Sequence, residues 1–380
     1  MKISDIFIIV KICEVSVKMT KAINSAVMRE KNEKLILSLI NKDAKSRTEI
    51  AKRIGLTKSA MTKIMDDLIQ RGIVTEQIEK SNTIGRSPVM LFLNEKAFYV
   101  VGINITRRRI TVGITDLGGN IVAQDEFPIC SPDIALVKIK ETIDAQIEMS
   151  GIDASKIFKA SVITPGPVDT EGGLVLNPPN FEQWHSLPIV DKLEELTGID
   201  VVLANISSAT AIAEKHFGAA QNTENFLALL VEIGLGSGIV IKGSLLEGPC
   251  ELGHTSIKHN GIECECKNRG CLEKYASIPS ILKGTNYESW QEAVDNDDEE
   301  LIYKEAEYLS AAIISANNIF KFDKIVLCGE IAYKPEKIVN FISEKTKEKT
   351  LSKQSFVVCA GTVRSKLIVA ASVAINNFFE

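Results

Sequence analysis

The hydrophobic pattern of the first hundred residues predicts three short helices. In the first, over residues 34–41, the apolar positions follow helical spacing: Leu35, Ile36, Leu39 and Ile40. Ser46 and Glu49 have the spacing of a capping box that opens a second helix, which Gly55 ends. Thr57 caps a third helix over residues 58–71, whose inward positions are Met61, Ile64, Met65, Leu68 and Ile69. Helix, glycine-containing turn and helix in this order predict a helix-turn-helix.

A polar hairpin follows the third helix and ends at Gly85-Arg86-Ser87-Pro88, before an apolar run over residues 89–93. We interpret this hairpin as a wing, because an arginine held between glycine and proline suits a narrow minor groove. The expected DNA-binding residues are Arg47, Thr57, Lys58, Ser59, Thr62, Lys63 and Arg86. The alternative is a helical dimerisation module whose basic residues only solvate its surface.

The rest of the chain contains two similar β-rich stretches. Residues 99–122 read as alternating strands closed by a Gly-Gly turn, and residues 226–245 repeat the order strand, glycine-rich hairpin, strand. Helical and βα segments follow each stretch, which predicts a duplicated α/β body with two lobes. The apolar segments 301–320 and 363–379 are expected to be helices of the core, or to pack between lobes or subunits. The predicted domains are residues 1–95 and 96–380.

Charge is divided unequally between these two parts. Residues 1–93 carry 17 Lys and Arg against 10 Asp and Glu, a net charge of +7, so the other 287 residues carry −12 of the total of −5. This asymmetry favours a nucleic-acid-binding module joined to an acidic body. Eight cysteines without a secretory signal point to a reducing cytoplasm. The apolar run over residues 6–10 is too short to span a membrane; residues 1–18 are an extra helix, or translation starts at Met19.

Three of the eight cysteines lie within eight residues. His254, Cys264, Cys266 and Cys271 together provide one imidazole and three thiolates, a complete tetrahedral shell for structural Zn²⁺. His259 is an alternative fourth ligand that spacing does not exclude. The other interpretation is three reduced thiols in a loop, which the Cys-x-Cys in a polar, glycine-containing segment disfavours.

Several motifs resemble the ROK family (repressor, open reading frame, kinase). They are residues 46–72 with Gly85-Arg86, the segments 165–169 and 177–184, Glu251-Leu-Gly-His254, and the cysteine cluster followed by Leu-Glu273. The resemblance covers the chain from about Met19. It implies a winged helix fused to a ribonuclease-H-like, actin-like body of the sugar-kinase type, as in repressors of xylose and N-acetylglucosamine use. It also implies zinc at the His-Cys cluster and sugar hydroxyls at Glu251, His254 and Glu273.

The chain departs from the kinases of that family where phosphate and proton transfer would occur. The phosphate hairpins carry Asn104-Ile-Thr-Arg-Arg108 and Glu232-Ile-Gly234 in place of the family's Asp-x-Gly-Gly-Thr and Gly-Thr-Gly, and Cys328-Gly-Glu330 replaces a Gly-Gly-Gly. Ile206 stands where family kinases have the aspartate that serves as general base. Isoleucine cannot accept a proton, and loss of a positioned base costs about 10²- to 10⁴-fold in rate.

We therefore expect a transcriptional regulator, and specifically a repressor, with no kinase activity. Asn205, Glu251, His254 and Glu273 are the expected sugar-binding residues. The expected partners are operator DNA, a sugar effector, and a second copy in a homodimer or dimer of dimers, with no membrane. Two alternatives remain: an active sugar kinase fused to a DNA-binding domain, and a DNA-binding dimer insensitive to ligand. The sequence leaves open the effector, the operator, and repression versus activation.

Overall fold

A computed structural model describes residues 25–42, 45–78, 89–248, 250–347, 349 and 355–380. The chain divides into two compact units, residues 1–92 and 93–380. The predicted wing at residues 85–88, including Arg86, lies outside the described residues. So do residues 1–18 and the alternative start at Met19.

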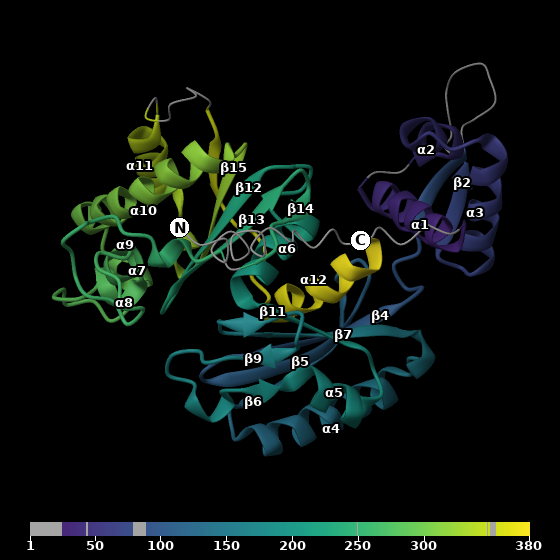
Figure 1. Cartoon of the computed structure of the whole chain (residues 1–380), viewed down its shortest axis with the longest axis horizontal. Helices are drawn as coiled ribbons and strands as arrows, with labels where there is room; N and C mark the ends of the chain where they lie inside the picture. Colours follow the sequence, from purple (N-terminus) through teal and green to yellow (C-terminus); the bar gives the residue numbers. More distant parts are fainter. Residues whose placement is uncertain (1–24, 43–44, 79–88, 249, 348, 350–354) are drawn as a thin grey trace, which may run out of the picture. The chain divides into compact units, whose positions relative to one another are not determined.

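The described residues of the first unit form three helices and a three-stranded sheet (Figure 1). The helices are α1 (Ser25–Lys42), α2 (Arg47–Ile54) and α3 (Lys58–Gln70), and the sheet has the order β1 (Lys45–Ser46), β3 (Val89–Leu93), β2 (Val74–Ile78). The predicted capping box is present, since Ser46 Oγ accepts from the Glu49 N–H and the Glu49 carboxylate accepts from the Ser46 N–H at 2.8 Å. Gly55 ends α2 with φ 72°, in the left-handed region that glycine adopts without a steric penalty.

The first helix is longer than the sequence pattern predicted, and its buried face differs. α1 begins at Ser25, and Leu35 is 45% exposed whereas Leu37 is 3% exposed. Arg71 ties α3 to α1, because its Nη1 donates to Glu33 at 2.6 Å and to Asp67 at 3.2 Å. The face of α1 that becomes buried is therefore chosen by the neighbouring helices, which apolar spacing alone does not identify.

The second unit repeats one sheet pattern twice (Figure 1). One sheet has the order β11-β7-β4-β5-β6 and the other the order β16-β15-β12-β13-β14. In each, an antiparallel hairpin (β4–β5 or β12–β13) is extended by two parallel strands (β7 and β11, or β15 and β16). This topology agrees with the predicted duplication of an α/β unit.

The strands of the first of these sheets are β4 (Tyr99–Ile105), β5 (Arg109–Asp116), β6 (Ile121–Pro128), β7 (Ile157–Thr164) and β11 (Val201–Asn205). Those of the second are β12 (Phe226–Val231), β13 (Leu235–Ile241), β14 (Ser244–Leu245), β15 (Lys324–Gly329) and β16 (Val357–Ala360). A small sheet joins β8 (Val168–Asp169), β9 (Leu174–Val175) and β10 (Leu187–Pro188). The longer helices are α4 (Pro132–Ser150), α5 (Ile189–Thr197), α6 (Ile206–Phe217), α10 (Glu299–Phe320), α11 (Glu336–Thr346) and α12 (Lys366–Phe379).

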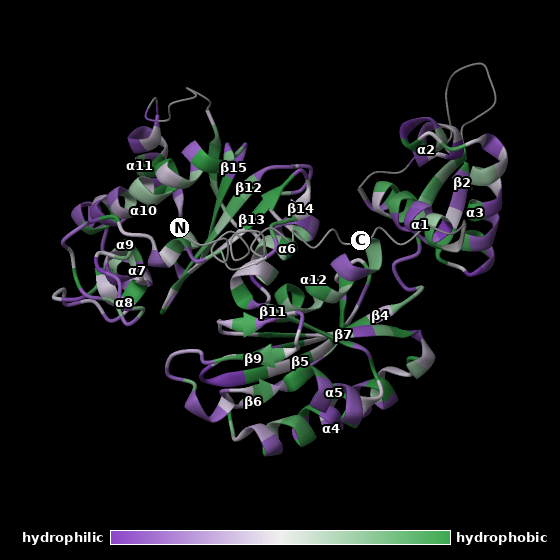
Figure 2. Ribbon diagram, viewed as in Figure 1, coloured by the Kyte–Doolittle hydropathy of each residue, from purple (hydrophilic) through white to green (hydrophobic). Residues whose placement is uncertain are grey.

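Two helices lie between the two sheets. α12 packs on β4, β5 and β7, α6 packs on β12 and β13, and the two helices contact each other (Figure 1). Hydrophobic residues line the central strands and most of α12 (Figure 2). The segment 363–379 was expected in the core, between lobes or between subunits, and its helix α12 forms part of the core between the sheets. α10 belongs to the separate core on β12, β13 and β15.

Glycines allow both helices to approach their sheets closely. A Cβ on Gly102 of β4 would lie 2.9 Å from the backbone nitrogen of Ala371 in α12. A Cβ on Gly238 of β13 would lie 2.5 Å from Ala211 Cβ and 2.8 Å from the Ser207 carbonyl oxygen in α6. Gly238 of β13 thus has a packing role in this chain.

Among the described helices, none combines the length and the hydrophobicity needed to cross a bilayer.

We expect Gly238→Ala to destabilise the second unit by about 1–3 kcal/mol, because the added methyl group overpacks the contact between β13 and α6. Chemical denaturation should show a lower midpoint. Ser244→Ala, at an exposed position on the neighbouring strand β14, is the control and should change stability by less than about 0.5 kcal/mol. Equal stability of the two variants would contradict the packing role of Gly238.

Candidate functional site

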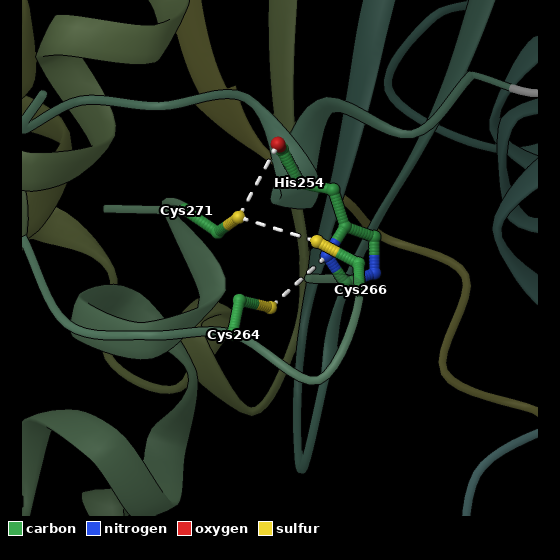
Figure 3. Close-up of side chains that lie close together, drawn as sticks. All are labelled: His254, Cys264, Cys266 and Cys271. Carbon is green, nitrogen blue, oxygen red and sulfur yellow. Dashed lines mark hydrogen bonds between the residues drawn. The ribbon is translucent and has the colours of Figure 1, made fainter. Parts of the chain in front are cut away.

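The four predicted metal ligands meet in one cluster (Figure 3). The ligand atoms of His254, Cys264, Cys266 and Cys271 all lie within 4.8 Å of one another. His254 Nδ1 is 3.6 Å from Cys264 Sγ, and Cys266 Sγ is 3.6 Å from Cys271 Sγ. A tetrahedral site with metal–sulfur distances of about 2.3 Å has edges of about 3.8 Å, so the side chains fit a metal of that size.

The structure selects His254 over the alternative ligand. His254 ends the 3₁₀ helix η5 (Leu252–His254), which brings its ring to the thiols, whereas His259 is exposed and is not part of the cluster. The imidazole of His254 and the three thiols therefore lie together, as the predicted ligand set requires.

The loop that bears the cysteines is folded by its own backbone. Cys264 N–H donates to the Asn268 carbonyl at 2.9 Å, and Gly270 N–H donates to the Ile262 carbonyl at 2.8 Å. Gly270 has φ 73°, and a Cβ there would lie 1.7 Å from the Lys258 carbonyl oxygen, so only glycine fits this position. The turn therefore requires glycine at position 270.

Burial makes two of the thiols weak acids in the absence of a cation. Burial raises the pKa of Cys264, and it raises the pKa of Cys271 to about 12. The exposed Cys266 has a lowered pKa because its sulfur is near the backbone N–H of Asn268. Metal ligation requires thiolates, so a bound cation would supply the charge compensation that two buried thiolates need.

The elements that carry the expected sugar-binding residues meet at the start of β13. The Glu273 carboxylate, in α7 (Glu273–Ala276), accepts from the Leu235 N–H at 2.8 Å. Gly253 of η5 lies against the Leu235 carbonyl, where a Cβ would come within 2.3 Å. Gly236 abuts Ser207 in the first turn of α6. Glu273, the Glu251–His254 segment and the N-terminus of α6 therefore share one backbone support.

Part of the hydrogen-bonding capacity of these side chains is already used. Asn205 is the N-cap of α6, and its Oδ1 accepts from the Ser208 N–H at 2.7 Å, which leaves its amide nitrogen for a ligand. One oxygen of Glu273 is held by Leu235, while Glu251 is exposed at the entry to η5. Each side chain thus keeps at least one polar atom for a sugar hydroxyl.

The residues at the hairpins that the resemblance connects with phosphate have different surroundings in the structure. The Glu232 carboxylate forms an ion pair with Lys366, the first residue of α12, at 2.5 Å. Burial and the nearby Glu232 raise the pKa of Glu330. Asn104 is 1% exposed, and its Oδ1 has no hydrogen-bond partner among the described residues. Ile206 packs against the apolar clusters around α6.

Sequence reasoning did not assign a role to two residues that the fold makes prominent. Arg107 entered only as an altered phosphate-loop residue, yet it is half-buried, and its Nε donates to the Pro179 carbonyl at 2.9 Å. Glu214 of α6 is 1% exposed and accepts from the backbone N–H groups of Ala219, Thr362 and Val363. For Arg107, the only local signal in the sequence was the run of three arginines at 107–109. For Glu214 the sequence held no local signal.

Residues 100–373 match the ROK family. The chain belongs to this family. It is 32% identical over 263 residues to the xylose repressor of Bacillus subtilis (strain 168), an alignment that covers 67% of this chain and 68% of the relative.

Two solved ROK structures share the fold. A ROK family transcriptional regulator, described as a homolog of the Escherichia coli Mlc protein, has a TM-score of 0.79 and 25% identity and covers 93% of this chain and 97% of its own. A ROK hexokinase from Thermus thermophilus has a TM-score of 0.64 and 26% identity and covers 74% of this chain and 100% of its own. The kinase match thus accounts for less of this chain than the regulator match.

We expect the purified protein to contain one divalent metal ion per chain, measured by elemental analysis. Cys264→Ser should remove most of it, because a hydroxyl is a poor replacement for a buried thiolate ligand. Cys130→Ser, at a half-buried cysteine outside the cluster, is the control and should retain the metal. Full metal content in Cys264→Ser would show that the four side chains do not form the site.

Proposed function

We propose that this protein is a sugar-responsive, DNA-binding transcriptional regulator, a repressor of carbohydrate-use genes, with a sugar-kinase-like body that no longer phosphorylates sugars. The observation that carries this proposal is the match to a ROK transcriptional regulator over 93% of the chain. The xylose repressor among its relatives points to the same class of function. The basic N-terminal unit and the altered phosphate sites support it independently.

The N-terminal unit has the element order expected of a winged helix-turn-helix. α2 and α3 are joined by the turn at Gly55, and Thr57 caps α3 by accepting from the Ala60 N–H at 3.3 Å. The proposed contact residues on α3, Lys58, Ser59, Thr62 and Lys63, are all exposed. Within the described part of the chain, neither lysine has an ion-pair partner. Helix N-terminal residues of this kind enter the major groove in helix-turn-helix proteins.

Arg47 fits a structural role better than DNA contact. Its Nε donates to Glu76 at 2.8 Å and its Nη1 donates to Asp66 at 2.9 Å, which joins the start of α2 to α3 and β2. The two carboxylates already occupy the guanidinium, so we leave Arg47 out of the proposed DNA surface. Arg86 stays in the proposal on sequence grounds alone.

The body is proposed to bind sugar without chemistry. Ile206 packs against the core at the position where family kinases have the general base. Lys366 forms an ion pair with Glu232, at a hairpin that binds phosphate in those kinases. Glu251, His254, Glu273 and Asn205 still offer hydrogen-bonding atoms around β13. An active sugar kinase is the second candidate function, because the whole length of the hexokinase from Thermus thermophilus matches this chain.

The metal at the His-Cys cluster is proposed to be structural Zn²⁺. Three thiolates and one imidazole fill a tetrahedral shell, so no position remains for a catalytic water. The ion would hold the loop between His254 and Glu273 and thereby position the sugar-binding glutamates. Its effect on sugar binding would be indirect.

Sugar binding is proposed to change the distance between two recognition helices in a homodimer or dimer of dimers. A ligand shifts such an equilibrium only by its difference in affinity for the two states. Binding to the body must therefore favour the conformation that does not fit the operator.

We expect at least one monosaccharide to release the protein from its operator in gel shifts with a sugar panel, because the body keeps four polar side chains for hydroxyls. Glu251→Ala should abolish release while leaving DNA binding intact. No release by any sugar would favour the ligand-insensitive DNA-binding dimer. ATP-dependent phosphorylation of a panel sugar that is lost in Glu251→Ala would favour the kinase.

We expect Lys58→Ala and Lys63→Ala each to weaken operator binding and to lower the slope of log affinity against log salt by about 1, because each removes one phosphate contact. Fluorescence anisotropy over a salt series measures both quantities. Lys31→Ala, an exposed lysine on α1, is the matched control. A slope unchanged in both α3 variants would refute the assignment of α3 as the recognition helix.

A further inference from the structure

A cavity of about 360 Å³ lies along the open edge of one sheet of the second unit. β11 is the last strand of that sheet (Figure 1), and Val201, Val202 and Leu203 line the cavity. The other lining residues belong to the turn between β8 and β9, the start of α5, the middle of α6 and the C-terminal half of α12. The volume is within the range of about 300–1,000 Å³ that is typical of ligand sites.

The hydrogen-bonding direction of β11 alternates along the strand. In the parallel ladder with β7, the Ala160 N–H donates to the Asp200 carbonyl at 2.8 Å. Alternate residues of a strand bond the same neighbour, so Val202 also bonds β7, whereas the backbone groups of Val201 and Leu203 point to the open edge.

The chain itself uses one of these edge groups. The Val201 N–H donates to Glu194 Oε1 at 2.8 Å. Within the described residues, no group donates to the Val201 carbonyl and none accepts from the Leu203 N–H. Leu203 is 5% exposed, so an unpaired N–H there is costly unless a ligand or water meets it. The edge therefore offers the cavity a carbonyl acceptor and an N–H donor.

The charged side chains that line the cavity are both acidic. Glu171 lies in the turn between β8 and β9, and Asp191 lies in the first turn of α5. Both are exposed, neither forms an ion pair with another described residue, and no lysine, arginine or histidine is among the lining residues. A cationic group would therefore be attracted to this cavity, and an anionic group would be repelled.

The turn and the helix that carry these carboxylates are fixed to each other. The Asp169 carboxylate accepts from the Gly172 N–H at 2.9 Å and thereby holds the turn that carries Glu171. Gly173 has φ 66°, and a Cβ there would lie 2.7 Å from Val190 Cβ, so the turn packs directly on α5. The wall of the cavity that bears the negative charge is therefore preformed.

We propose that this edge binds an extended, basic segment of a partner protein, which adds to β11 as a further strand. One residue of such a segment donates its N–H to the Val201 carbonyl and accepts from the Leu203 N–H, as neighbouring strands do in a parallel sheet. Lysine or arginine side chains on the adjacent residues pair with Glu171 and Asp191. A small amine lacks the acceptor that the Leu203 N–H requires, and a free amino acid brings a carboxylate that the two acidic residues repel.

Blocked tripeptides test this on the full-length protein by ligand-observed NMR titration. The probes are acetyl-Lys-Ala-Lys-amide, its counterparts with alanine or glutamate in place of lysine, and butylamine. The lysine tripeptide should bind at least about fivefold tighter than the alanine one, because two exposed ion pairs each contribute modestly, and the glutamate one should bind weakest. Equal affinity of the three tripeptides, no binding of the lysine tripeptide, or equally tight binding of butylamine overturns the proposal.

Methylation of the peptide backbone tests strand addition without changing the protein. N-methylation of the central alanine removes the N–H that the Val201 carbonyl would accept, and it should weaken binding about fivefold or more. N-methylation of the third residue is the matched control and should leave the affinity nearly unchanged, because that N–H points away from β11. Equal effects of the two methyl groups would show that the peptide does not extend the sheet and would overturn the proposal.

Changes in the protein test the two charges. Glu171→Gln combined with Asp191→Asn should abolish the preference for the lysine tripeptide, because both changes keep the shape of an exposed side chain and remove its charge. Glu195→Gln, at an exposed position of α5 outside the cavity, is the control and should keep the preference. A preference that persists in the double variant places the peptide elsewhere on the protein and overturns the proposal.

No residue that lines the cavity is a candidate metal ligand or a candidate sugar-binding residue. Peptide binding at β11 is therefore confirmed or refuted separately from operator binding, sugar response and metal content.

Discussion

The close packing of two helices between two sheets is the constraint on which the rest of the body depends. α12 lies on β4 and α6 lies on β13 at distances that a Cβ on Gly102 or Gly238 would obstruct. The Glu214 carboxylate then joins the end of α6 to the segment before α12 through three backbone N–H groups. Because both helices are fixed in this way, Asn205 at the N-terminus of α6 has a defined position relative to β13.

The elements that carry the candidate sugar-binding residues lie around the start of β13, which packs against α6. The Leu235 N–H donates a hydrogen bond to the Glu273 carboxylate, and the Leu235 carbonyl contacts Gly253. The adjacent Gly236 contacts the first turn of α6. The His-Cys cluster lies in the segment that joins η5 to α7, so a metal there would restrain both elements that bear glutamates. A small shift of this backbone would therefore change the position of every candidate sugar-binding residue.

Residues at the hairpins that the family resemblance connects with phosphate are engaged by other parts of the same chain. Phosphate sites need unpaired donors and cations, whereas Lys366 is paired with Glu232, and the partly buried Ile206 packs against the core. The ROK fold is thus shared with a hexokinase, while a carboxylate at one of these hairpins is paired within the chain itself.

The sequence determined the features that depend on near neighbours in the chain. The capping box of Ser46, the αL end at Gly55, the repeated strand order and the His-Cys set are all local patterns, and the structure contains them. Contacts between distant segments were decided only by the tertiary structure. They include the burial of Leu37 in place of Leu35, the ion pairs of Arg47 with Asp66 and Glu76, the placement of His254 rather than His259 among the thiols, and the hydrogen bond from Arg107 to the Pro179 carbonyl. Spacing specifies the backbone conformation of a segment, but the partner of a charged side chain depends on which other segment the fold brings beside it.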